Sequence, residues 1–127
     1  MVYNKEPMQV LWDALKSLNA KIPIYKETMT EDDDSTPASY LLIRSDISNT
    51  PEVPGDGRTQ VRGSDCDVLL VSKGIASNST DLHNVNRGKV TAALNAAGIT
   101  FDAYNLGYDD KLKSTQYSWS MRLFYIL

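Results

Sequence analysis

The sequence predicts an α+β domain in which a mostly antiparallel β-sheet of about five strands packs against two α-helices. Two stretches repeat apolar side chains at helical spacing, and five others have the composition or alternation of strands. The clearest strand is the last, where every second side chain from Tyr117 to Leu127 falls on one face of an extended chain. These side chains are Tyr117, Trp119, Met121, Leu123, Tyr125 and Leu127. We expect the order α-β-β-β-α-β-β.

The first predicted helix runs from about Lys5 to Leu18, with Pro7 in its first turn, where a missing N–H costs nothing. Its apolar stripe consists of Met8, Leu11, Trp12, Leu15 and Leu18. The segment Lys21–Tyr25 reads as a short strand, which Pro23 confines to a sheet edge or a strand end. Residues 28–37 are polar and form a predicted loop.

The middle of the chain predicts two core strands separated by a long loop. Ala38–Ile47 contains an apolar run that suits a central strand, and Arg62–Lys73 has a buried middle at Val68–Val71. Between them, Ser48–Arg58 holds two prolines and two glycines, which predicts a loop rather than a helix or a regular strand interior. A loop this long is usually functional or mobile, so we expect a mobile loop at about 48–61. The two strands flanking it are expected to pair.

The second predicted helix starts near Ser79 as N-cap and ends at Ala97, before Gly98. Its packing face is Val90, Ala93, Leu94 and Ala97, extended backward less regularly by Leu82, Val85 and Asn86. Ile99–Leu106 is the next predicted strand, and a polar turn connects it to an antiparallel partner at Gln116–Leu127.

Length and composition indicate one domain that needs no disulfide or metal. The 127 residues carry a net charge of −3, and the whole acidic excess lies in residues 1–34. No stripe of Lys and Arg is present, which argues against nucleic-acid binding. The start of the chain has no apolar signal segment, so we expect a soluble protein of a reducing compartment, with no membrane contact. The single cysteine, Cys66, lies between Asp65 and Asp67 and is expected to be a buried or inert thiol.

Three groups of residues could carry chemistry, and each has a simpler interpretation. Glu31–Asp34 could hold a divalent cation, but contiguous carboxylates point to different sides, so we interpret it as a solvated loop. Pro54–Gly57 lacks the lysine and the helix of a phosphate-binding loop and is interpreted as a tight turn. His83, with Ser79 and Asp81 nearby, suggests a triad, but we expect a polar surface histidine. The sequence therefore predicts no catalytic residue, no metal and no cofactor.

Taken along its whole length, the chain resembles the tail-completion or tail-terminator proteins of long-tailed bacteriophages. The resemblance begins with the helix ending near Leu18 and the short strand closing on Tyr25. It continues through the Pro37–Ile43 strand, an irregular loop, Arg62 with Asp67–Val71, Val90–Leu94 with Gly98, and the terminal Arg122–Leu127 strand.

The resemblance implies a virion structural protein, not an enzyme, which forms a ring, typically a hexamer, that caps the head-proximal end of the tail tube or joins tail to head. Its partners would be further copies of itself, the tail tube protein and head-completion or connector proteins. It would reside in the virion tail, and in the host cytoplasm during assembly. The loop that orders on assembly would map onto Pro51, Glu52, Val53, Pro54, Gly55, Asp56, Gly57 and Arg58.

Two other functional classes stay open at this point. One is a small ligand-binding or enzyme domain with a pocket between the sheet and the helices. The other is a cytosolic adaptor that binds a protein partner along an exposed sheet edge. The acidic run Glu31–Asp34 has no counterpart in the family pattern.

Overall fold

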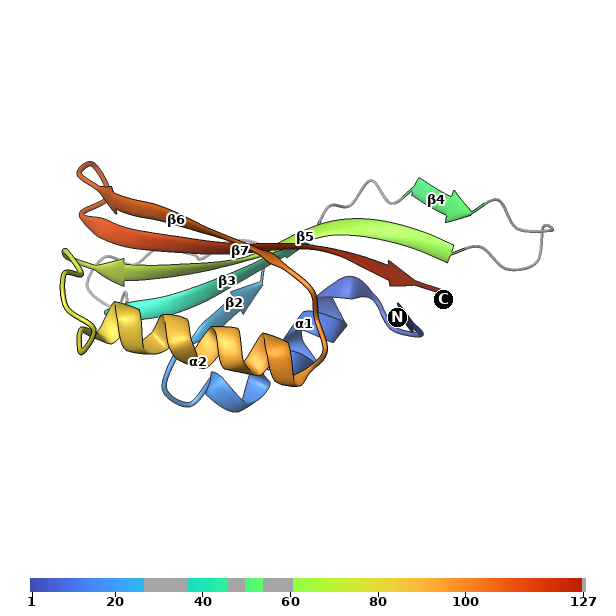
Figure 1. The fold of residues 1–127 in the computed structure, drawn as a ribbon, viewed down its shortest axis with the longest axis horizontal. Coiled ribbons are helices and arrows are strands. Elements are labelled where there is room, and N and C mark those ends of the chain that lie inside the picture. Colours follow the sequence, from blue (N-terminus) through green and yellow to red (C-terminus); the bar gives the residue numbers. More distant parts are fainter. Residues whose placement is uncertain (27–36, 46–49, 54–60, 127) are drawn as a thin grey trace.

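The computed structural model describes residues 1–26, 37–45, 50–53 and 61–126, which form a seven-stranded mixed sheet with both helices on one face (Figure 1). In chain order the elements are β1 (Val2–Tyr3), α1 (Pro7–Leu15), the 3-10 turn η1 (Lys16–Leu18), β2 (Ile24–Lys26), β3 (Ser39–Ser45), β4 (Thr50–Val53), β5 (Val61–Lys73), α2 (Leu82–Ala96), β6 (Asp102–Asp109) and β7 (Ser114–Tyr125).

The seven strands occupy five positions across the sheet. The long antiparallel pair β5 and β7 forms the centre, in register from Arg62 opposite Tyr125 to Lys73 opposite Ser114. On the far side of β7, β6 pairs antiparallel with its first part and β1 pairs parallel with its end. On the far side of β5, β4 and β3 pair antiparallel with successive parts, and β2 lies parallel to β3 at the outside.

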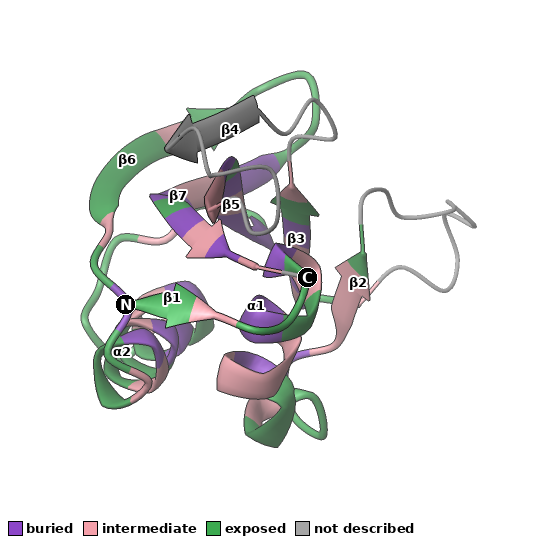
Figure 2. Cartoon of the chain, turned by 90° about the vertical axis from the view of Figure 1, so that its right-hand side faces the viewer, coloured by how far each residue is buried: buried purple, intermediate pink, exposed green. Residues whose placement is uncertain are grey.

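The hydrophobic core lies between the sheet and the helices. Val68, Leu70 and Trp119 of the central strands are fully buried there, as are Leu11 and Leu15 of α1. Figure 2 shows the buried residues concentrated on the facing sides of these elements. The indole N–H of Trp119 donates a hydrogen bond to Thr91 Oγ1 of α2 at 3.1 Å, which satisfies its only donor. The alternation predicted for the last strand is confirmed at Trp119, Met121, Leu123 and Tyr125.

The α+β class is confirmed, but the predicted sheet was wrong in detail. The sheet is mixed rather than antiparallel, because β1 runs parallel to β7 and β2 runs parallel to β3. The two-residue β1 is too short for any periodicity to predict. For β2, a residue pattern fixes which side chains share a face but carries no information on the direction of the neighbouring strand.

Two segments depart most from their predicted boundaries. Thr50–Val53, predicted as part of a loop, forms the strand β4, whose one strand neighbour among the described residues is β5, a setting in which a proline such as Pro51 is tolerated. The strand predicted at Ile99–Leu106 runs instead from Asp102 to Asp109, since Ile99 is buried in the connection after α2. As predicted, Gly98 follows the end of α2, with a φ of 75° that favours glycine.

Candidate functional site

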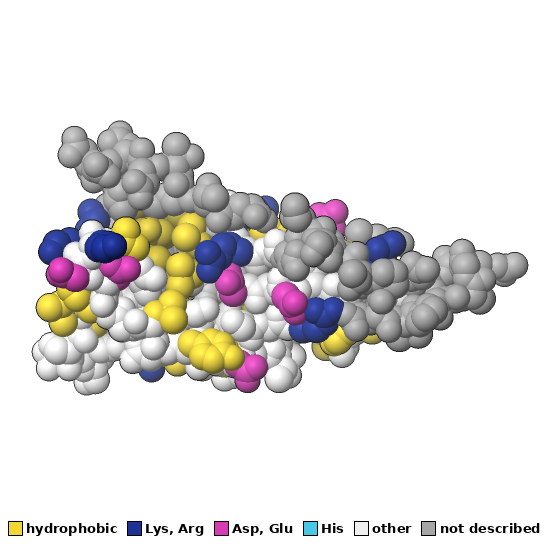
Figure 3. Space-filling model, turned by 90° about the horizontal axis from the view of Figure 1, so that it is seen from above, with side chains coloured by type: hydrophobic (Ala, Val, Ile, Leu, Met, Phe, Trp, Pro, Cys, Tyr) yellow, Lys and Arg dark blue, Asp and Glu magenta, His cyan; other side chains and the backbone are white. Residues whose placement is uncertain are grey.

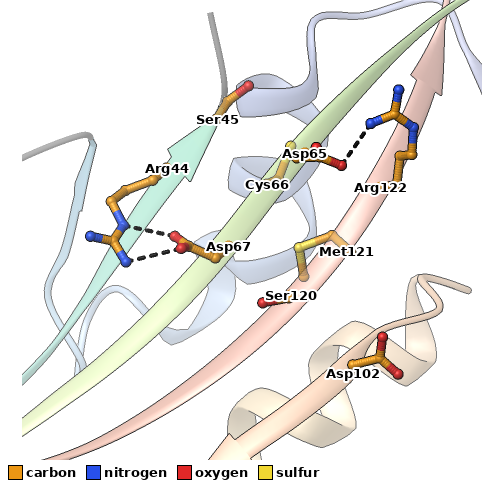
Figure 4. Close-up of a pocket in the computed structure, with 9 residues that line it drawn as sticks. All are labelled: Arg44, Ser45, Asp65, Cys66, Asp67, Asp102, Ser120, Met121 and Arg122. Carbon is orange, nitrogen blue, oxygen red and sulfur yellow. Dashed lines mark hydrogen bonds and ion pairs between the residues drawn. The ribbon is translucent and has the colours of Figure 1, made fainter.

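The sheet face turned away from the helices carries a row of charged and polar side chains across four strands. Its members stand directly opposite one another on β3, β5, β7 and β6: Arg44, Asp67, Ser120 and Asp102. A second cross-strand pair, Asp65 and Arg122, lies two residues farther along β5 and β7. Together they line an open hollow of about 570 Å³ (Figure 4).

The charges in this hollow largely neutralise one another. Arg44 binds Asp67 in a bidentate pair, with Nε to Oδ1 at 2.7 Å and Nη2 to Oδ2 at 2.9 Å. Arg122 Nη1 contacts Asp65 Oδ1 at 2.7 Å. Because these side chains are partly exposed, each pair is worth no more than about 1 kcal/mol. The hollow therefore has the character of a contact surface rather than of an ion-binding site.

Apolar side chains continue the same face beyond the charged row. Leu42 stands opposite Leu69, and Tyr40 stands opposite Val71, on β3 and β5. Leu69 and Val71 are buried, whereas Tyr40 and Leu42 are half-buried. Figure 3 shows hydrophobic side chains gathered on this face beside the Arg and Asp pairs. The face thus combines an apolar area with charges of both signs, a composition that suits protein contact.

Cys66 also lines the hollow. Its side chain is buried, and its Sγ lies 3.6 Å from the Ser64 carbonyl oxygen. Burial raises the pKa of the Cys66 thiol, and the neighbouring Asp65 and Asp67 raise it further. Of the expected buried or inert thiol, the burial is confirmed, and a raised pKa disfavours the thiolate that a nucleophile needs.

Strand β6 forms an edge of the sheet with unusually exposed apolar side chains. Among the described residues, no strand lies along its other side. Tyr104, Leu106 and Tyr108 are 52%, 55% and 39% exposed. At the opposite edge, the short β2 carries Pro23 just before it and Lys26 at its end, and Asn19 Oδ1 accepts the Ile24 N–H at 3.0 Å. Short length, a proline and a charged side chain are the usual protections of an edge strand, and β2 has all three. The β6 edge is therefore the one more available for pairing.

The prediction of a polar surface position for His83 was wrong. His83 is 4% exposed, and its Nδ1 lies 2.9 Å from Ser72 Oγ. Ser72 Oγ in turn lies 2.8 Å from Ser39 Oγ, which accepts a hydrogen bond from Asn86 Nδ2 at 3.0 Å. These four buried side chains join α2 to β3 and β5. Hydrogen bonding within the group offsets the cost of burying them.

The buried stripe of α2 differs from the predicted one for the same reason. His83 and Asn86 are buried together with Val90 and Leu94, whereas Leu82 and Val85 are 54% and 39% exposed. The suggested triad of Ser79, Asp81 and His83 does not form. Asp81, and not Ser79, is the N-cap of α2. Its Oδ2 accepts the N–H groups of Ser77 and Asn78 at 2.7 and 2.8 Å, which lowers the Asp81 pKa.

The site predicted from the loop is only partly within the described residues. Pro51, Glu52 and Val53 belong to β4, while Pro54, Gly55, Asp56, Gly57 and Arg58 lie outside the described residues. The acidic run Glu31–Asp34 lies outside them as well. The exposed β6 edge was missed, although Tyr104, Leu106 and Tyr108 alternate in sequence with smaller or polar residues as in a strand. The sequence does not show the bulge between Asn105 and Gly107, which places Tyr104 and Tyr108 on opposite faces of the sheet.

In comparisons with known proteins, the chain matches no family model and no curated protein. Within the described residues, no helix is long and apolar enough to cross a membrane. The same residues contain no group of three or more His, Cys, Asp or Glu side chains placed to hold a metal ion.

Proposed function

We propose that this protein is a structural subunit of a long-tailed bacteriophage tail, which forms a ring that caps the head-proximal end of the tail tube or joins it to the head. The sequence resemblance is the starting point of the proposal. The structural observation that carries it is the β6 edge, since a long edge strand with exposed apolar side chains on both sides of its bulge suits an assembly surface better than a solvent-facing one.

The charges of β6 favour a head-to-tail contact over a symmetric dimer. If two copies paired antiparallel about the middle of β6, Asp102 of each copy would stand opposite Asp109 of the other. Like charges directly opposite across strands are destabilising. A contact between β6 and a different surface of the next copy avoids this repulsion, and repeating such a contact generates a ring when the rotation closes.

The open face of the sheet and the predicted loop would provide further contacts. The half-buried Tyr40 and Leu42 of β3, beside the paired charges, suit packing against the tail tube or a connector protein. Residues 51–58 remain the proposed segment that orders when subunits join.

The test replaces apolar side chains of the β6 edge by lysine. The double variant Tyr104→Lys, Leu106→Lys should fold normally because both side chains are largely exposed, and it should fail to form rings. Leu112→Lys is the matched control, since Leu112 is 64% exposed but lies in the turn after β6. Mass photometry over a concentration series reports ring formation.

Assembly with tail tubes provides the second readout. If the ring stops tube growth, tubes assembled with the double variant should show a broad length distribution in negative-stain images, while Leu112→Lys should give uniform tubes. Normal rings and uniform tubes with the double variant would contradict the role of β6. An adaptor that binds a protein along β6 is the alternative that the same edge favours, and it predicts a partner protein but no self-assembly.

A further inference from the structure

A second pocket, separate from the open face, lies between the start of α2 and the bulged part of β6. It has a volume of about 240 Å³. The polar side chains that line it are His83, Asn84, Arg87, Asn105, Tyr108 and Thr115. No Asp or Glu is among its described lining residues.

The hydrogen-bond network offers one arrangement in which each hydroxyl donates once and accepts once. In it Ser39 Oγ accepts from Asn86 and donates to Ser72 Oγ. Ser72 then donates to His83 Nδ1, its other neighbour. We assign His83 this tautomer, with the hydrogen on Nε2, for which no partner is present among the described residues.

Arg87 and Asn105 line the same pocket as His83 and offer further donors. Arg87 lies one helical turn after His83, with its guanidinium stacked 4.1 Å from the centre of the Tyr117 ring. Asn105 Oδ1 accepts the Gly107 N–H at 3.0 Å, which leaves the Asn105 Nδ2 hydrogens to donate. The lining also contains one amide acceptor, Asn84 Oδ1, whose Nδ2 donates to the Asn78 carbonyl oxygen at 2.7 Å. The hydroxyl of Thr115 is already used by the Gly74 carbonyl oxygen at 2.6 Å.

We infer that this pocket binds a carboxylate group, held by the guanidinium of Arg87, the Nε2–H of His83 and the Nδ2–H of Asn105. A planar group with two acceptor oxygens matches several convergent donors and one positive charge. Burial, reinforced by the charge of Arg87, lowers the pKa of His83, so that Arg87 alone supplies the charge and a single carboxylate balances it. The volume admits a short aliphatic carboxylate or one acidic side chain of a protein. The inference does not depend on ring formation.

The test is an NMR titration of the ¹⁵N-labelled protein with two probes at constant ionic strength. One probe is sodium glutarate, a small free carboxylate, and the other is a capped peptide of residues 27–36, the most acidic segment of the chain itself. Sodium chloride serves as the blank. We expect saturable shifts of the Gly107 amide, the Arg87 Nε–H and the His83 ring nitrogens. Saturation by glutarate would indicate a small-molecule ligand, and saturation by the peptide alone would indicate a protein-borne carboxylate.

The decisive variant is Asn105→Asp, which keeps an oxygen for the Gly107 N–H but replaces the donor by a negative charge. It should weaken binding at least tenfold. Asn95→Asp makes the same charge change at an exposed position outside the pocket and should bind like the wild type. Absence of saturable shifts with both probes, or unchanged binding by Asn105→Asp, would overturn the inference.

Discussion

The two faces of the central strands β5 and β7 differ in what their side chains contact. Toward the helices, Val68, Leu70 and Trp119 are completely buried. On the other face, alternate positions carry Asp65 and Arg122, which pair with each other near solvent. The difference teaches that the face toward the helices maintains the fold, while the charged positions of the other face, beside the buried Leu69 and Val71, can vary with little loss of stability. Substitutions on the two faces should therefore separate stability from assembly.

The largest effect should come from removing residues 124–127. The deletion removes both β7 positions that pair with β1, including the buried Tyr125. Burial of one large apolar side chain is worth about 1.5 to 3 kcal/mol, against a total stability of about 5 to 15 kcal/mol. We expect the truncated chain to be insoluble or to lack a cooperative thermal transition by circular dichroism. A soluble chain with the wild-type transition would show that the end of β7 contributes nothing to the core.

Adjacent residues of β7 offer the sharpest comparison of the faces. Trp119→Ala removes a fully buried ring and its bond to Thr91, and should reduce the free energy of unfolding by about 3 to 5 kcal/mol. Ser120→Ala, on the open face, should change it by no more than about 0.5 kcal/mol. Urea denaturation measures both. Similar losses for the two variants would contradict the assignment of faces.

A medium effect is expected for His83→Ala. The substitution leaves the Ser72 hydroxyl without its acceptor in the core, which should cost about 1 to 3 kcal/mol of unfolding free energy. Lys89→Ala, at an exposed position of the same helix, is the control and should be nearly neutral. Urea denaturation of both variants is the measurement. Equal stability of His83→Ala and wild type would mean that the buried network is not a stabilising contact between α2 and the sheet.

The same histidine predicts how stability depends on pH. Because burial lowers the folded-state pKa of His83 below the ordinary value of 6.5, the unfolded chain takes up a proton first as the pH falls. His83 should therefore make no pH-dependent contribution to the free energy of unfolding above about 6.5, and that free energy should decrease as the pH falls below it, until the folded-state pKa is reached. His83→Ala should lose this slope. At alkaline pH the raised pKa of the Cys66 thiol acts in the opposite sense. The lowered pKa values of Asp13 and Asp81 act only below their ordinary 3.8, outside this range.

The smallest effect is expected for the ion pair of the open face. Arg44→Ala and Asp67→Asn should each change the free energy of unfolding by no more than about 1 kcal/mol, because the pair is partly exposed. Thermal unfolding at low and high salt is the measurement, and the small loss should shrink further with salt. A loss of several kcal/mol would place this pair among the residues that maintain the fold.

Long segments with a regular apolar pattern could be predicted from the sequence. Short strands, and strands recognisable only by the neighbouring strand with which they pair, could not. Val68–Val71 and the alternation of β7 identify the central strands because a regular pattern over many residues has few alternative explanations. The two-residue β1 is too short to show a pattern. The strand β4 was not predicted because it contains Pro51, and a proline in an edge strand cannot be told from a proline in a loop by sequence.

The candidate sites were harder to predict because they depend on residues distant in sequence. From sequence, a polar residue such as His83 is expected to be exposed, because its hydrogen bond to Ser72, which in turn bonds Ser39 of another strand, becomes visible only in the fold. The openness of β6 likewise follows from the pairing of the whole sheet, which leaves nothing beside Tyr104 and Leu106 in the described part of the chain.

The central position of β7 has a consequence for synthesis of the protein in the cell. β7 follows every other described strand in the chain and so leaves the ribosome after them, yet it joins β5 on one side to β6 and β1 on the other. Until it emerges, the apolar positions of β5 and the inner sides of α1 and α2 lack their partner, so the nascent chain cannot fold progressively from its N-terminus. We therefore expect the nascent chain to depend on molecular chaperones during translation, and folding to follow in one late, cooperative step.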